Sequence, residues 1–176
     1  MIPDRGVSDG QWTNWLERLT CEYASADPEV LEIWGYPSQP SFAPSDIVDL
    51  HVSTTAATWG FEIWRDGIDF IKVYEEHGLA GVHHPTNADP VADGCGWPIG
   101  ASVTIPEDWL SGGYVIVFIG EHHGQQVTQD GFFVLRAADP GTRSRLALVL
   151  ATYSWQEYND WGGGCGYFSD EFVDLS

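Results

Sequence analysis

Oxygen-bearing side chains gather in the segment 152–163, where their types and spacing could do chemistry. The group comprises Tyr153, Tyr158, Asn159 and Asp160. Phenol, amide and carboxylate oxygens bind hard cations, and the same groups can hold a polar substrate. They follow an apolar run over 146–150, and open α/β sheets place their ligands at the C-terminal ends of such buried strands. The alternative is that these oxygens only satisfy backbone groups in a tight loop.

Two pairs of adjacent histidines, His83–His84 and His122–His123, suggest a metal site. Adjacent side chains on a strand point to opposite faces, so neither pair could chelate an ion from a regular strand. Both pairs fall in expected loops, where that restriction relaxes, but no Asp or Glu stands at a recognised metal-binding spacing from them. We therefore interpret these histidines as solvated loop residues.

Acidic pairs and tryptophans suggest carbohydrate chemistry. Glu75–Glu76 and Glu107–Asp108 could serve as glycosidase carboxylates, and nine tryptophans could stack on sugar rings. Adjacent acids in turns of so acidic a chain are expected to be solvated, and most of the indoles are expected to cap a small core. A carbohydrate-binding module is the main non-enzymatic alternative.

Short alternating segments must position these groups. Apolar and polar residues alternate, or apolar residues run together, over 32–36, 47–53, 59–64, 68–74, 101–106, 114–120 and 131–137. Turn residues separate the segments, with long loops expected over 77–98 and 121–130. About seven strands at this spacing predict a mainly β fold, an immunoglobulin-like antiparallel β-sandwich over 31–139.

The sandwich is expected to be flanked by two other segments. Residues 1–30 form a predicted helical lead-in, with Trp12, Trp15, Leu16 and Leu19 on one face. Residues 140–176 form a predicted linker and the first strand of an α/β domain. Each parallel crossover needs a dozen or more residues, so we expect that domain to be truncated at Ser176.

The charge of the chain restricts its partners. The 176 residues include 26 acidic and 7 basic side chains, which gives a formal net charge of -19. Such a surface repels phosphate backbones and anionic membranes, so neither nucleic acid nor a membrane is expected as a partner. No leader or apolar run of membrane-spanning length, ~20 residues, is visible, which favours a soluble, cytoplasmic protein. The three cysteines are too far apart for a C-x-x-C site and are read as free thiols.

Several motifs in consistent order resemble the large (beta) subunit of N,N-dimethylformamidase and its relatives. They are GY at 35–36, FAPSD at 42–46, VDLHVSTT at 48–55, GCGWP at 94–98, IPEDWLSG at 105–112 and WQEYNDWGG at 155–163. The resemblance spans about residues 31–163. The tail after Gly163 is not expected to continue the family pattern.

The resemblance implies a β-sandwich leading into an amidotransferase-like α/β catalytic domain. In such amide hydrolases an iron ion held by two tyrosines and a glutamate activates water against a formamide carbonyl. Tyr158 is the residue that the resemblance marks as a metal ligand, and Tyr153, Asn159 and Asp160 would line the site. One phenolate cannot hold iron well.

Two functions therefore follow from the sequence. The first is a fragment or accessory portion of an amide hydrolase, inactive alone, completed by self-association or by a protein subunit that supplies the rest of the α/β domain. The second is a stand-alone sandwich module for binding or assembly, including one that binds carbohydrate.

Overall fold

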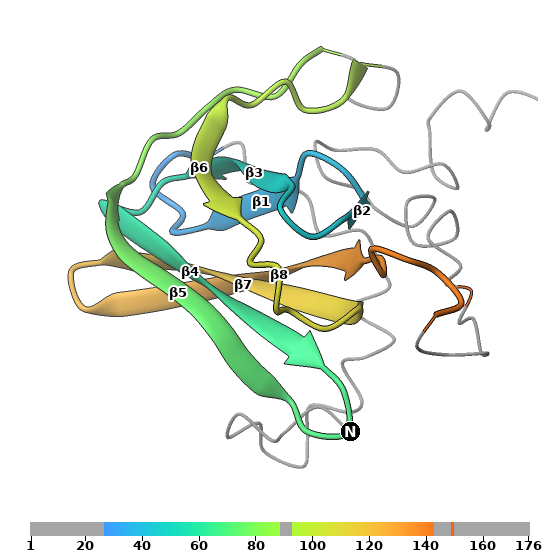
Figure 1. The fold of residues 1–176 in the computed structure, drawn as a ribbon. Helices are drawn as coiled ribbons and strands as arrows, with labels where there is room; N and C mark the ends of the chain where they lie inside the picture. The colour runs from blue at the N-terminus through green and yellow to red at the C-terminus, as the bar shows by residue number, and fades with distance from the viewer. Residues whose placement is uncertain (1–26, 89–92, 143–148, 150–176) are drawn as a thin grey trace, which may run out of the picture. The chain divides into compact units, whose positions relative to one another are not determined.

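The computed structural model of the chain describes residues 27–88, 93–142 and 149, which are mainly β-strand (Figure 1). The strands are β1 (Ile33–Pro37), β2 (Ser41–Phe42), β3 (Ile47–Thr54), β4 (Thr58–Asp66), β5 (Ile71–Ala80), β6 (Ile99–Thr104), β7 (Gly112–His122) and β8 (Gln125–Leu135). All eight belong to one compact unit, while 86–88 and 93–96 belong to another. The predicted mainly β fold is confirmed.

Two sheets make up the sandwich. One has the order β1-β3-β6, and the other has the order β2-β8-β7-β4-β5. Every pairing is antiparallel except that of β2 with β8. The strand order of both sheets is that of an immunoglobulin-like sandwich. In the immunoglobulin naming, β1, β3 and β6 are strands A, B and E of one sheet, and β4, β7 and β8 are strands C, F and G of the other. β5 is an added strand next to strand C.

The core lies between the inner faces of the two sheets. Its buried residues alternate along the strands, and the largest of the completely buried ones are Phe42, Leu50, Phe61, Ile63, Ile105, Tyr114, Ile116, Phe118, Phe133 and Leu135. Aromatic rings form a continuous layer, in which Tyr114 stacks on Phe133 at 5.2 Å and Phe133 meets Phe42 edge-on at 5.5 Å. The alternation seen in the sequence thus places one face of each central strand in the core.

The ring of Phe118 fits into a slot between the sheets. A Cβ atom added to Gly35 of β1 would lie 2.7 Å from this ring, and one added to Gly131 of β8 would lie 3.0 Å from it. Real Cβ atoms do not approach a ring as closely as the first of these distances. Glycine at position 35 therefore allows the ring to fill the space between the sheets.

Two strands differ from their predicted bounds. β5 begins at Ile71 and runs through His77 to Ala80, so the predicted long loop begins only at Gly81. β8 begins at Gln125, and the polar segment 125–130, predicted as loop, pairs with β7 in regular register. Its side chains are largely exposed, because this end of the hairpin needs no apolar face. Hydrophobic alternation cannot detect such a strand.

The predicted flanking segments mostly lie outside the described residues. Within the predicted helical lead-in, residues 27–30 form a turn instead of a helix: Glu29 N–H donates to Asp27 Oδ1 at 3.0 Å, and Val30 N–H donates to the Asp27 carbonyl at 3.1 Å. The linker and α/β strand predicted after 139 are described only for 140–142 and Val149. Within the described segments, no helix has the length and apolar character needed to cross a bilayer.

Candidate functional site

The oxygen-rich cluster predicted from the sequence lies beyond the described part of the chain. Tyr153, Tyr158, Asn159 and Asp160 are all among the residues that the structure does not describe. Their proposed roles in metal or substrate binding therefore stay predictions. The described sandwich offers two other groupings of polar side chains.

The first grouping lies on the outer face of the β4–β5 ribbon. Glu62 and Glu75 are directly opposite each other in the register, and their carboxylates together with the His77 ring place three ligand atoms within 4.8 Å of one another. Lys72 Nζ donates to both carboxylates, at 3.1 Å to Glu62 Oε1 and 2.6 Å to Glu75 Oε2. Both carboxylates are thus already paired with the same ammonium group.

A β-bulge places Lys72 in this grouping. The register shifts by one residue at Val73, between the pairs Ile63↔Tyr74 and Trp64↔Lys72. The extra residue turns Lys72 to the same face as Glu62 and Glu75. Cross-strand register of this kind cannot be read from a single sequence, and the grouping was missed for that reason.

Electrostatics show how the ammonium and carboxylates stabilise each other. Hydrogen bonds to Glu75 and Glu62 raise the pKa of Lys72, and the hydrogen bond from Lys72 lowers the pKa of Glu75. A metal ion would have to displace this ammonium group to bind here. The grouping is therefore a largely exposed ion-pair network, in which Lys72 of β5 bridges Glu62 of β4 and Glu75 of β5.

Two of the three described tyrosines, Tyr74 and Tyr114, do not fit the iron site that the resemblance implies. Burial raises the pKa of both Tyr74 and Tyr114. Their hydroxyl groups are also engaged as donors, Tyr74 to Glu76 at 3.2 Å and Tyr114 to the Leu110 carbonyl at 2.6 Å. A phenolate ligand must lose its proton, so these two residues are unsuited to that role.

The described tryptophans serve mainly in packing. Trp59 and Trp97 are buried. Trp64 is half-buried, but Phe70 stacks on its ring at 5.1 Å with the two planes at 6°, and Lys72 Nζ lies 5.7 Å from the ring centroid. The indole rings of these three tryptophans are therefore buried or already covered, which gives little support to sugar stacking on them.

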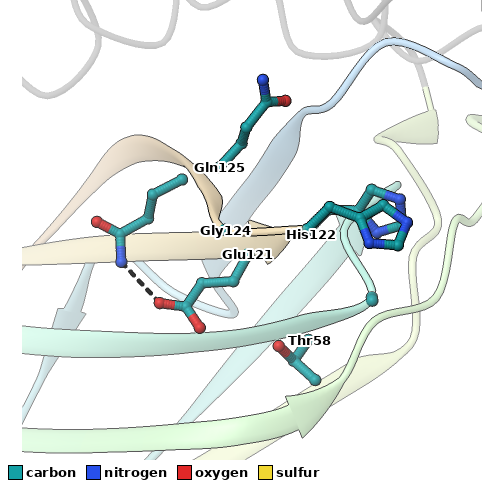
Figure 2. Close-up of a pocket in the computed structure, with 8 residues that line it drawn as sticks. Thr58, Glu121, His122, Gly124 and Gln125 are labelled. Carbon is teal, nitrogen blue, oxygen red and sulfur yellow. Dashed lines mark hydrogen bonds between the residues drawn. The ribbon is translucent and has the colours of Figure 1, made fainter.

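The second grouping is at the tip of the β7–β8 hairpin (Figure 2). His123 and Gly124 form a two-residue turn with φ of 49° and 77°, and His122 pairs with Gln125 to close it. Positive φ at both central residues is the signature of a type I′ turn, which suits the twist of a hairpin. A hollow of about 470 Å³ adjoins the turn and is lined by Ala57, Thr58 and residues 121–126.

The turn brings two imidazole rings together. The ring centroids of His122 and His123 are 4.2 Å apart, with the planes at 63°. His122 Nδ1 is buried and has no hydrogen-bond partner among the described residues. The Glu121 carboxylate points away from the His122 ring and accepts a hydrogen bond from Gln126 Nε2 at 2.8 Å (Figure 2).

The histidine pairs thus differ from each other, which the sequence did not reveal. His122 ends β7 instead of lying in a long loop, while His83 and His84 do lie in irregular chain. His84 is held there through its backbone, whose N–H and carbonyl both bond to Ser53 Oγ. The signal for the turn was the His-Gly dipeptide, since His tolerates positive φ more readily than most residues.

Comparison with protein families gives one match, which covers two thirds of the chain. A family model described as "N,N-dimethylformamidase beta subunit-like, C-terminal" matches residues 57–174. The match runs through the sandwich from the start of β4 and continues past Gly163, where the family pattern was expected to stop. No curated protein matches the chain.

Proposed function

The chain belongs to the N,N-dimethylformamidase beta subunit-like family, and from this premise we propose that it takes part in hydrolysis of the C–N bond of a small formamide-type amide. The observation that carries the proposal is the extent of the family match. It joins strands β4–β8 of the sandwich to the cluster 153–160 in one continuous segment, so the same family pattern contains both a large part of the scaffold and the candidate site.

In this proposal the sandwich is the scaffold, and the catalytic groups lie after Pro140. In one of the two polar groupings of the described sandwich the side chains already have structural partners, namely in the ion pairs of Lys72 with Glu62 and Glu75. Tyr158 is the proposed metal ligand, with Tyr153, Asn159 and Asp160 lining the site. Iron bound there would act as a Lewis acid on the amide carbonyl and lower the pKa of its bound water.

A protein subunit is the proposed partner. The family description refers to a beta subunit, which supports an assembly of more than one chain. A second copy of the chain could fill the same role, because a site with one phenolate needs further ligands from elsewhere. The second candidate function is that of a stand-alone sandwich module that takes part in assembly. A carbohydrate-binding function for such a module has little support from the described tryptophans.

The test is made on the protein isolated together with the subunits that accompany it. Iron content and formate release from N,N-dimethylformamide are compared for the wild type, Tyr158→Phe and the control Tyr167→Phe. We expect both readouts to fall in the Tyr158 variant and to be retained in the control. Iron content and formate release that are the same in both variants would refute the role of Tyr158, and an iron-free, inactive wild-type assembly would refute the proposed function.

A further inference from the structure

We propose that His122 and His123 bind a divalent transition-metal ion at the tip of the β7–β8 hairpin. The ion would belong to the zinc, copper and nickel class, for which neutral imidazole is a suitable ligand. Its ligands are other residues than those of the proposed iron site, and they are residues that the structure describes. It does not depend on the proposed amide chemistry.

The backbone of the turn makes the pair able to chelate. In a regular strand the two imidazoles would point to opposite faces, but the positive φ of His123 turns its ring to the side of His122. A non-glycine residue at positive φ is uncommon, and only Ser45 and His123 adopt it among the described residues. The conformation that costs energy is thus the one that brings the two rings together.

The distance between the rings is compatible with a shared ion. Zinc–nitrogen bonds of about 2.0–2.1 Å in tetrahedral geometry place two ligand nitrogens roughly 3.3 Å apart. The ring centroids are 4.2 Å apart, so rotation of the side chains can bring one nitrogen of each ring to that separation. No backbone movement is needed.

An unsatisfied nitrogen adds an independent reason. His122 Nδ1 is buried and has no partner among the described residues, and a buried polar atom without a partner destabilises the fold. Coordination would use that lone pair. The hollow of about 470 Å³ beside the turn leaves room for water on the remaining coordination positions. The formal net charge of -19 raises the local concentration of cations.

The competing group on β4 and β5 is less suited to hold the ion. Glu62, Glu75 and His77 bring three ligand atoms close together, but Lys72 Nζ lies at 3.1 and 2.6 Å from the two carboxylates. Binding there would require loss of both ion pairs. Among the described residues, no ammonium or guanidinium group forms an ion pair or hydrogen bond that would compete with a metal ion for the rings of His122 and His123.

The experiment is a calorimetric titration of the untagged chain with Zn²⁺ at neutral pH. We expect His122→Ala and His123→Ala each to lower the zinc affinity of one site by at least about tenfold. Loss of a residue that only supports a metal ligand already lowers affinity by about 10- to 100-fold, so loss of a ligand should do at least as much. His123→Asn is the folding control, because Asn also tolerates positive φ and keeps the turn without the imidazole. It should lose zinc to the same extent.

The chain provides matched controls in its other histidines. His83→Ala and His84→Ala remove the second adjacent pair, and His77→Ala removes a member of the β4–β5 group. These three control variants should bind zinc as the wild type does. Zinc ions that bind at sites other than the hairpin tip should remain bound in the hairpin variants as well. The proposal is overturned if the wild type binds no zinc, if His123→Asn binds as the wild type does, or if only the control variants lose binding.

Discussion

Replacing Gly35 with alanine should destabilise the sandwich, because the new methyl group would collide with the ring of Phe118. The added Cβ would lie 2.7 Å from two carbons of that ring, whereas ordinary contacts begin near 3.4 Å. The ring cannot move away freely, since Phe118 is fully buried and a Cβ at Gly131 would already touch its other edge at 3.0 Å.

The size of the effect follows from two opposing terms. Overpacking by one methyl group costs about 1–3 kcal/mol. The lower backbone entropy of an unfolded chain with alanine returns about 0.4–1 kcal/mol, because the φ of Gly35 is not in the region that only glycine favours. We therefore expect the free energy of unfolding to fall by about 1.3 kcal/mol, the midpoint of the difference between the two ranges, and by no more than about 2.6 kcal/mol.

Urea unfolding followed by tryptophan fluorescence measures this change, with an unchanged slope as a check on the two-state treatment. The matched control is Gly67→Ala, where the nearest atom is the flexible end of Arg65 at 2.8 Å. Its effect should stay within about 0.5 kcal/mol. Adding Phe118→Leu to Gly35→Ala should recover at least about 0.5 kcal/mol relative to the sum of the single changes. A neutral Gly35→Ala, or strict additivity, would refute the steric explanation.

Three further changes probe separate features. Lys72→Met removes the hydrogen bond that lowers the pKa of Glu75, so carboxyl NMR titration should show a higher Glu75 pKa in the variant, and an unchanged pKa would contradict this. A carboxylate with a lowered pKa contributes stability that is lost as the pH falls through that pKa, so the variant should also lose less stability than the wild type on acidification. Burial raises the pKa of the Cys95 thiol to about 11, so peptide mapping should find slow alkylation by iodoacetamide in the native protein and fast alkylation in urea; fast native labelling would exclude the buried site. His123→Val should lower the free energy of unfolding by about 1–3 kcal/mol, because a β-branched residue is strained at positive φ, while His123→Asn should leave it unchanged or higher; equal stability of the two variants would argue against the type I′ turn.

The central strands could be predicted from sequence because their two faces meet different surroundings. In β3, Val48, Leu50 and Val52 are buried while Asp49 and His51 are partly exposed, which is the pattern that the sequence displays. The same reasoning failed for the outer end of β8, where Val127 is the one apolar side chain among residues 125–130. Val127 packs against the core, but one apolar residue makes no alternating pattern, and it is the His-Gly turn that folds this segment back onto β7.

The groupings of polar residues were harder to predict, since each depends on backbone detail. The meeting of Lys72 with Glu62 and Glu75 requires a one-residue bulge at Val73. The meeting of His122 with His123 requires a left-handed conformation at a single residue. Alternation rules assume a regular strand, so they cannot anticipate side chains that irregularities bring together.

The parallel pairing of β2 with β8 gives the sandwich a mechanical property. Arg136 N–H donates to the Phe42 carbonyl at 2.8 Å, and Val134 N–H donates to the Pro40 carbonyl at 3.0 Å. β1 and β2 are consecutive in the chain but lie in different sheets, so this short pairing ties the two layers together. Tension that pulls residues before β2 away from residues after β8 would load these bonds together in shear, instead of opening them one at a time. The pairing of β2 with β8 is therefore expected to resist mechanical extension of the sandwich along this direction.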